Sequence, residues 1–283
     1  MTIDELYKHF VGQLKTIYDE RESENITDWI FESIAKIRRL DRLANKQKAI
    51  SDSTINQLNN ALQQLLQHKP VQYVLQEVWF YKMKLFVNEH VLIPRPETEE
   101  LVEWIIKEFR IQNSEFRILD IGSGCGCIPI ALKKELPNTE IISIDISEDA
   151  LAVAKKNAAD QNVKIDFKRV DFLNEKSWTS LPLFNIIVSN PPYIPENEKS
   201  KLNKNVTDHE PHTALFVADS DPFIFYRKIA DFAETHLVTE GKIFVEIHEN
   251  YSEQAEKIFA EKEFKTERRN DIYGRERMVK VYR

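Results

Sequence analysis

Asn190-Pro191-Pro192-Tyr193 is a segment whose residue types suit a planar, nitrogen-bearing group. Asn190 offers a side-chain carbonyl oxygen and Pro191 a backbone carbonyl, so the pair can accept both N–H groups of one amide or amine. Consecutive prolines fix φ and hold the preceding residue extended, which orders the acceptors before a ligand arrives. Tyr193 adds a flat aromatic face. Because such a nitrogen has a delocalised lone pair and is a poor nucleophile, the segment predicts a site that orients it to receive a methyl group.

A glycine-rich turn follows the apolar run at residues 116–121. Its sequence is Asp120-Ile121-Gly122-Ser123-Gly124-Cys125-Gly126. Glycines allow positive φ and a close approach of the backbone to a ligand, although a tight turn without a ligand can look the same. The spacing is Gly-x-Gly-x-Gly, whereas dinucleotide enzymes use Gly-x-Gly-x-x-Gly. The Asp120 carboxylate disfavours a pyrophosphate and suits the cationic amino acid end of S-adenosylmethionine. We therefore expect contacts to that cofactor from Asp120, Gly122, Ser123, Gly124, Cys125 and Gly126.

Two further acids stand at the ends of expected strands. Asp145 lies near the end of the apolar run 141–146, where an acid in an open α/β sheet accepts hydrogen bonds from ribose hydroxyls. Asp171 and Phe172 follow the run 163–170 and suit the adenine amino group and ring, with a turn-capping role as the alternative for Asp171. A glycine loop and two acids in this order indicate an adenosine ligand, and Asp120 favours S-adenosylmethionine over NAD.

The elements that must position these residues alternate between strand and helix from Ile93 onward. Apolar runs indicate strands at 116–121, 141–146, 163–170, 184–188 and 242–247, then short strands at 264–267 and 278–282. Helical patterns occupy 128–136, 150–159, 222–236 and 252–259. Such alternation predicts an α/β fold, with a parallel sheet covered by helices on both faces. The segment that begins at Asn190 then follows a central strand directly, which argues against a simple surface turn.

The chain before Ile93 has a different pattern. Thr2 and Glu5 have capping-box spacing, apolar residues then recur at helical intervals, and Pro70 ends the last helix. Residues 1–70 are therefore predicted to form a small helical bundle, with Trp29 on its apolar face. Alternating apolar residues suggest a β-hairpin linker at 71–93, followed by the α/β domain at 94–283. Trp104 is expected in the core of that second domain.

Composition limits the possible settings. The chain has 283 residues and a net charge of −7, from 46 acidic and 39 basic residues. A nucleic-acid binder usually has a basic excess, so no direct nucleic-acid partner is expected. The N-terminus has no signal-peptide pattern, and no run is long enough to cross a membrane. The two cysteines, Cys125 and Cys127, are too close together for an easy disulfide, which favours a reducing cytoplasm.

Three motifs together resemble the PrmC (HemK) family of peptide chain release factor glutamine methyltransferases. They are Val91-Leu92-Ile93-Pro94-Arg95-Pro96-Glu97-Thr98-Glu99-Glu100, the glycine loop and Asn190-Pro191-Pro192-Tyr193. Glu210-Pro211 and Gly274-Arg275 extend the match over nearly the whole chain. Gln76 departs from it, because the family commonly has glycine there. The resemblance implies a Rossmann-like seven-stranded methyltransferase domain, a parallel sheet with an antiparallel C-terminal strand, behind a helical-bundle domain.

The resemblance also implies a reaction and a partner. Family members methylate the side-chain amide nitrogen (N5) of the glutamine in the Gly-Gly-Gln motif of class I release factors. S-adenosylmethionine is the cofactor, S-adenosylhomocysteine is the product and no metal is needed. Asn190 and Pro191 would hold the glutamine amide, Tyr193 would line its pocket, and Asn190 would also border the cofactor. Arg95 and Glu97 are expected to make structural bonds, and the helical bundle is expected to bind the release factor. We expect a cytoplasmic monomer.

Two other readings remain open from sequence. The segment Asn190-Pro191-Pro192-Tyr193 also occurs in adenine-N6 DNA and RNA methyltransferases, although those usually need a target-recognition domain or a basic face. A non-catalytic S-adenosylmethionine-binding scaffold is the other alternative, and the intact segment argues against it. His209-Glu210-Pro211-His212 lacks the i, i+4 histidine spacing of a zinc helix, so a metal site is not expected there.

Overall fold

A computed structural model of the chain describes residues 1–110 and 116–283, and these residues form two compact units. The first, the N-terminal unit, comprises Met1–Glu77 and Asn203–His209. The second, the sheet unit, comprises Val78–Leu202 and Glu210–Arg283. One short segment from late in the chain therefore belongs to the unit built mainly from the chain's beginning.

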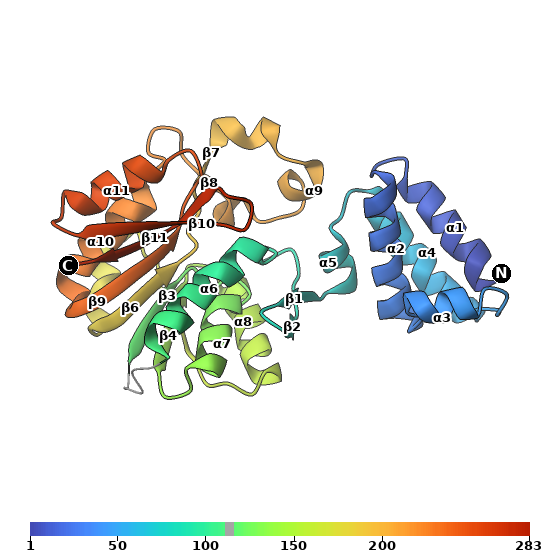
Figure 1. Ribbon diagram of the computed structural model, residues 1–283, viewed down its shortest axis with the longest axis horizontal. Helices are drawn as coiled ribbons and strands as arrows, with labels where there is room; N and C mark the ends of the chain where they lie inside the picture. The colour runs from blue at the N-terminus through green and yellow to red at the C-terminus, as the bar shows by residue number, and fades with distance from the viewer. Residues whose placement is uncertain (111–115) are drawn as a thin grey trace. The chain divides into compact units, whose positions relative to one another are not determined.

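The N-terminal unit is helical (Figure 1). Its helices are α1 (Ile3–Leu14), α2 (Glu20–Ala35), α3 (Arg39–Ala44), α4 (Asp52–Leu66), α5 (Val71–Leu75) and α9 (Lys204–Thr207). The predicted capping box is present, with the Thr2 backbone N–H donating to Glu5 at 2.8 Å and the Glu5 N–H donating to Thr2 Oγ1 at 3.3 Å. Phe10 and Phe31 meet edge to face in the core, with ring centroids 5.7 Å apart. The unit thus has a hydrophobic core of its own.

The expectation that Trp29 is a core residue is wrong, because 52% of its surface is exposed. The buried face of α2 is formed by Ile26, Thr27, Ile30 and Phe31. A helix turns about 100° per residue, which carries Trp29 well away from the centre of that face. Trp104, in contrast, is buried as predicted.

The chain between 71 and 93 is only partly a hairpin. Its strands are β1 (Val78–Phe80) and β2 (Met83–Leu85), which pair antiparallel, whereas Val71–Leu75 is helical. Pro70 is the N-cap of that helix, and its fixed φ of −54° is compatible with the start of a helix. Gln76 caps it with φ +55°, in the left-handed region. A non-glycine residue there is disfavoured by about 1 kcal/mol.

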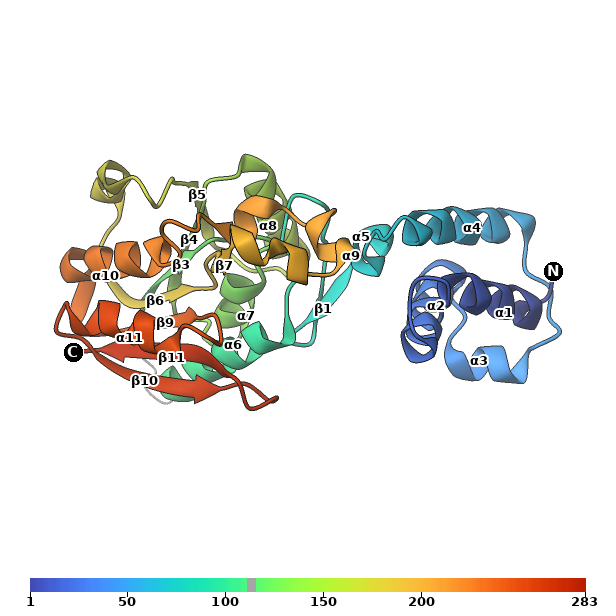
Figure 2. The same cartoon turned by 90° about the horizontal axis from the view of Figure 1, so that it is seen from above.

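A seven-stranded sheet organises the described residues of the second unit (Figure 2). Its order is β10-β11-β9-β6-β3-β4-β5. The strands are β3 (Arg117–Ile121), β4 (Glu140–Asp145), β5 (Asp166–Arg169), β6 (Phe184–Ser189), β9 (Leu237–Glu246), β10 (Lys265–Asn270) and β11 (Glu276–Tyr282). Strands β5, β4, β3, β6 and β9 run parallel, while β11 is antiparallel to β9 and β10. The predicted parallel sheet with an antiparallel C-terminal strand is confirmed.

Helices cover both faces of this sheet (Figures 1 and 2). They are α6 (Pro96–Phe109), α7 (Cys127–Glu135), α8 (Glu148–Asp160), α10 (Ile224–His236) and α11 (Ser252–Ala260). On one face Trp104 of α6 meets Phe244 of β9 at 5.6 Å between ring centroids. On the other, Phe232 of α10 meets Phe184 of β6 at 6.2 Å. The central strands are therefore buried on both sides, which explains why most of their residues are apolar.

The sequence patterns did not predict some helix and strand boundaries, nor some of the short elements. Strand β5 is shorter than the run 163–170, and α10 begins at Ile224, after the expected start at 222. The pair β7 (Ile194–Pro195) and β8 (Phe216–Val217) was not expected, nor were the 3₁₀ turns Glu175–Ser180, Glu196–Lys201 and His212–Ala214. Among the described residues, no helix has the length and apolar character required to cross a bilayer.

Candidate active site

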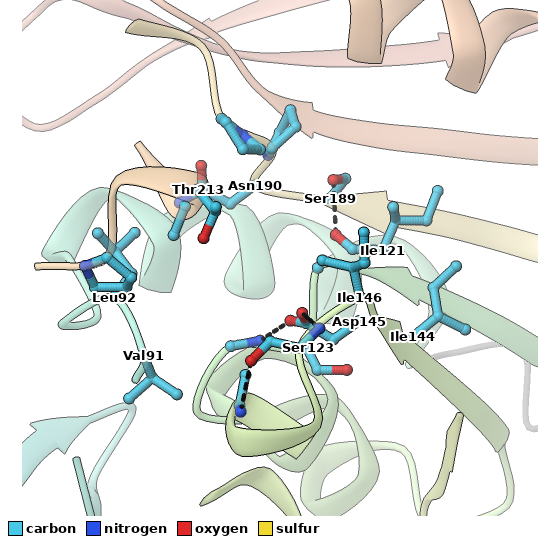
Figure 3. A pocket seen from close by; sticks show the side chains of 18 of the residues that line it. Val91, Leu92, Ile121, Ser123, Ile144, Asp145, Ile146, Ser189, Asn190 and Thr213 are labelled. Carbon is cyan, nitrogen blue, oxygen red and sulfur yellow. Dashed lines mark hydrogen bonds between the residues drawn. The ribbon is translucent and has the colours of Figure 1, made fainter. Parts of the chain in front are cut away.

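The carboxyl ends of β3, β4 and β6 border a cavity of about 180 Å³ that opens to solvent. Figure 3 shows Asn190 and Asp145 on different sides of it. Ten of the sequence-predicted site residues border the cavity: Gly122, Ser123, Gly124, Cys125, Asp145, Asp171, Phe172, Asn190, Pro191 and Pro192. The fold therefore brings the glycine loop, the two strand-end acids and the proline segment to one place.

The glycine loop is held open by left-handed backbone at its three glycines, with φ +86° at Gly122, +51° at Gly124 and +81° at Gly126. The backbone N–H groups of Gly122 and Ser123 both donate to the Ile144 carbonyl, at 2.9 and 3.0 Å. At Gly126 a Cβ would lie only 3.2 Å from that of Ala154 on α8. The glycines thus serve the backbone conformation, and Gly126 also allows close helix packing.

Asp145 fastens the glycine loop to the start of α8. Its Oδ2 accepts the Gly124 N–H at 3.0 Å, and its Oδ1 accepts the Ser147 N–H at 2.9 Å (Figure 3). Burial raises the pKa of the Asp145 carboxyl, while these backbone donors oppose the rise. Each carboxylate oxygen has two lone pairs, so a second acceptor position remains for a ligand hydroxyl.

Asp171 and Phe172 border the cavity after the end of β5. Asp171 Oδ1 accepts the Leu173 N–H at 3.1 Å, so its carboxylate also serves the turn, as the alternative reading expected. Phe172 packs against Trp178 with ring centroids 5.5 Å apart, and the Trp178 indole N–H donates to the Phe172 carbonyl at 2.9 Å. The Phe172 ring is thereby fixed before any adenine reaches it.

Asp120 lies elsewhere than its sequence role suggested. It is fully buried and is not among the described residues that border the cavity. Its Oδ2 accepts the Ser143 hydroxyl at 2.6 Å, whereas Oδ1 has no hydrogen-bond partner among the described residues. Burial raises the pKa of Asp120 to about 8, since desolvation disfavours the charged form. Its role towards the cofactor stays a prediction.

A hydrogen-bonded chain supports the Asn190 side chain. Asn190 Nδ2 donates to Thr98 Oγ1 at 3.1 Å, and the Thr98 hydroxyl donates to Glu246 Oε2 at 2.7 Å. The Tyr193 hydroxyl donates to Glu246 Oε1 at 3.0 Å. Burial raises the pKa of Glu246, and the donated bonds from Thr98 and Tyr193 oppose that rise. Asn190 Oδ1 has no hydrogen-bond partner among the described residues, so an acceptor oxygen is left for a ligand.

Tyr193 and Gly126 are the remaining predicted residues that do not border the cavity among the described positions. Tyr193 packs against the hydrophobic core of the sheet unit, and its hydroxyl points to Glu246. Burial raises the pKa of the Tyr193 phenol, which keeps it protonated and able to donate. The contact to the substrate's planar group that we expected of Tyr193 therefore stays a prediction.

Sequence reasoning did not assign roles to Thr98, Glu246 and Glu210. Glu210 is buried, accepts the Arg95 guanidinium at 2.6 Å and accepts the Ile93 N–H at 3.2 Å. Arg95 therefore makes the structural bond that the sequence predicted. A usable signal existed for Glu246, because an acid directly follows the apolar run Ile243-Phe244-Val245 at the end of β9. Thr98 gave no separate signal within its polar surroundings.

No group of three or more His, Cys, Asp or Glu side chains that could hold a metal ion occurs within residues 1–110 and 116–283. Both cysteines, Cys125 and Cys127, are free thiols.

Comparisons with known proteins agree with this geometry. The chain matches the methyltransferase small domain at residues 98–210 and the PrmC N-terminal domain at residues 5–75. It is 42% identical to the release factor glutamine methyltransferase of Flavobacterium psychrophilum, over 99% of both chains. It is 38% identical to the protein of the same name from Streptococcus pneumoniae, over 99% of this chain and 98% of the relative. A methyltransferase structure from Pyrococcus furiosus shares the fold, with a TM-score of 0.52 at 14% identity over 79% of this chain and 98% of that chain.

The seven-stranded sheet, the glycine loop and the proline segment at one cavity define a Rossmann-like methyltransferase. Within that class, the 42% sequence identity to a relative over 99% of both chains shows the family. The chain belongs to the release factor glutamine methyltransferase family, and the resemblance seen in the sequence is confirmed.

Proposed function

We propose that this protein transfers a methyl group to the side-chain amide nitrogen of the glutamine in the Gly-Gly-Gln motif of class I release factors. One observation carries the proposal. Asn190 borders the same cavity as the glycine loop and Asp145, and its amide nitrogen is already engaged by Thr98. A free carbonyl oxygen is thus fixed where a methyl donor and a planar amide would meet.

The acceptor residues act by orientation. Asn190 Oδ1 and the Pro191 carbonyl accept the two N–H groups of the glutamine amide, and this directs the nitrogen's lone pair towards the donor. Both acceptors are fixed in advance, since consecutive prolines restrict the backbone and Thr98 holds the Asn190 side chain. Preorganised acceptors lower the barrier because little ordering remains to be done in the transition state.

The cofactor residues fit S-adenosylmethionine. The left-handed glycine loop allows a close backbone approach, Asp145 keeps acceptor positions for ribose hydroxyls, and Asp120 is an incompletely paired buried acid near a site for a cationic ligand. When bound, S-adenosylmethionine supplies an electrophilic methyl group on a sulfonium. Transfer forms the N–CH3 bond, breaks the S–CH3 bond and leaves S-adenosylhomocysteine. The surplus proton leaves the nitrogen afterwards, so no general base is required.

A methylation assay tests the proposal. Purified protein is incubated with a class I release factor and S-adenosylmethionine, and the product is mapped by mass spectrometry. A single added methyl group on the Gly-Gly-Gln glutamine is expected, and a release factor with alanine in place of that glutamine serves as the control. Methyl transfer to DNA or RNA with none to the release factor would instead select the adenine-N6 activity.

The N-terminal unit is proposed to bind the body of the release factor, since a tripeptide offers little area for specificity. Three of its apolar side chains are exposed: Trp29 on α2, and Leu40 and Leu43 on α3. An ion pair between Asp28 and Arg42, at 3.5 Å, links these two helices. Tryptophan is among the residue types enriched at the hot spots of protein interfaces, so Trp29 is the candidate anchor.

A substitution separates docking from chemistry. Trp29→Ala is expected to raise KM for intact release factor by roughly 10-fold or more, as for an interface anchor. KM for a short Gly-Gly-Gln peptide should stay unchanged, because the peptide lacks the release factor body that the N-terminal unit is proposed to bind. Equal changes for both substrates would contradict the docking role. We propose that the enzyme acts as a cytoplasmic monomer, which sedimentation of the free protein can check.

A further inference from the structure

We propose that Glu246 and Thr98 are positioning residues that decide which end of the Asn190 amide faces the acceptor nitrogen. This inference rests on the proposed function. An asparagine amide is nearly symmetric in shape, and its oxygen and nitrogen can exchange places by rotation about one bond. Only one orientation presents an acceptor to the substrate's N–H group, so the protein needs a device that selects it.

The number of protons available to the hydrogen bonds among Asn190, Thr98 and Glu246 identifies what selects the orientation of the Asn190 amide. An ionised carboxylate only accepts hydrogen bonds, and Glu246 accepts from Thr98 at 2.7 Å and from Tyr193 at 3.0 Å. The Thr98 hydroxyl has a single proton, which it gives to Glu246, so its oxygen can only accept from its other neighbour. Asn190 must then offer its NH2 group, at 3.1 Å, and Oδ1 is left for the ligand. The charge on Glu246 thus fixes the polarity of Asn190.

The surroundings of Glu246 leave little room for another arrangement. The residue is buried, with 2% of its surface exposed, and it ends β9 beside β6, the strand that leads into Asn190. The Tyr226 hydroxyl donates to the Glu246 backbone carbonyl at 3.2 Å, and Arg277 and Glu97 are the charged groups that act on the carboxyl. Both carboxylate oxygens are occupied by donors. A proton on either oxygen would compete with Thr98 or Tyr193.

The first test removes the relay without changing its shape. Thr98→Val should lower kcat by roughly 10–100-fold, the size expected when a reacting group is misplaced. Binding of S-adenosylmethionine, measured by calorimetry, should change little. Thr98→Ser keeps the hydroxyl and should restore most of kcat. As a matched control, Thr139→Val deletes another buried hydroxyl, one that donates to the Leu136 carbonyl just before β4, and should leave kcat as it is.

The second test reads the orientation itself. With S-adenosylhomocysteine present, the protein is titrated with a Gly-Gly-Gln peptide and with a Gly-Gly-Glu peptide, whose carboxylate can only accept. The native protein should prefer the glutamine peptide. In Thr98→Val and in Glu246→Gln, which places an N–H donor inside the chain, that preference should fall by roughly 10-fold, about the effect of reversing one hydrogen bond.

The outcomes are distinguishable. Equal weakening of both peptides in the two variants would make Thr98 and Glu246 merely structural and overturn the inference. So would a native kcat in Thr98→Val. If native protein fails to methylate a release factor at all, the proposed function fails instead, before any variant is made. Should Thr98→Val not fold, Glu246→Gln provides the same comparison, because it preserves size and the bond to at least one partner.

Discussion

The cavity has a side where we propose that the acceptor amide binds, around Asn190, and a side where we propose that the cofactor binds, around the glycine loop. The two sides differ in how completely their polar groups are paired. Around Asn190, the side chains of Thr98, Glu246 and Tyr193 satisfy one another, and a single acceptor oxygen is left over. Just before the glycine loop, and not bordering the cavity, Asp120 is buried with one carboxylate oxygen unpaired among the described residues, and burial raises its pKa to about 8. One side is complete before a ligand arrives, while the other stays electrostatically incomplete.

The difference indicates how binding energy is used. A neutral amide contributes little electrostatic energy, so its site must be ordered beforehand to be effective. A cationic ligand can contribute more, since it relieves the burial of an acid that the folded protein otherwise tolerates at a cost. Acceptor-side substitutions should therefore affect kcat, and cofactor-side substitutions should affect affinity and stability.

The largest effect is expected from Asn190→Ala. Removing one preorganised acceptor should lower kcat by about 10²–10³-fold, as the loss of an oxyanion-hole donor does. Calorimetry should show nearly native affinity for S-adenosylmethionine. A variant that loses cofactor affinity in proportion to kcat would break the division between the two sides.

The next effect concerns the cofactor side and uses a matched pair of glycines. Gly126→Ala places a Cβ 3.1 Å from Ile130 Cδ1 and 3.2 Å from Ala154 Cβ at φ +81°. Gly124→Ala has the same kind of backbone at φ +51° but meets no atom within 4 Å. Urea unfolding should show a loss of about 2–3 kcal/mol for Gly126→Ala and about 1–2 kcal/mol for Gly124→Ala.

Activity refines this second prediction. In Gly126→Ala, KM for S-adenosylmethionine should rise while kcat at saturating cofactor stays near native, because the acceptor chain around Asn190 is untouched. Equal destabilisation of the two glycine variants would show that packing against α8 contributes nothing at this turn. A large loss of kcat at saturating cofactor would contradict the prediction that the cofactor side and the acceptor side act independently.

The sequence predicted the elements that border the cavity better than the side-chain contacts between those elements. The strands, the glycine loop and the proline segment carry local signals, because apolar runs, glycine spacing and paired prolines each restrict the backbone directly. Thr98 and Glu246 are 148 positions apart, and their contact depends on how α6 packs on β9. Trp29 shows the same limit at short range, since a bulky apolar residue next to a buried face was mistaken for part of it.

The surroundings of the Asp120 side chain differ from those that the sequence predicted. Its position before the glycine loop suggested a direct ligand contact, yet the carboxyl is fully buried and bonded to Ser143. Successive side chains of a strand point to opposite faces of the sheet. The apolar pattern of β3 alone did not predict which face the Asp120 side chain would take. The unpaired Oδ1 becomes visible only when the burial of every neighbour is known.

The smallest effect tests that buried acid directly. The folded-state pKa of Asp120 is about 8, against an ordinary value of 3.8, so the fold favours the neutral form. Its contribution to stability is fully present below pH 4 and is lost as the pH rises towards 8. Asp120→Asn stays neutral, so its melting temperature relative to native protein should rise by roughly 5 °C between pH 5 and pH 8 in the absence of ligand. An exposed acid, Glu240→Gln, supplies the control and should show no such change.

At pH 8 S-adenosylmethionine should raise the melting temperature of native protein more than that of Asp120→Asn, because only the native protein has a charge to neutralise. A pH-independent difference, or equal stabilisation of both by the cofactor, would remove the contrast between the two sides of the cavity.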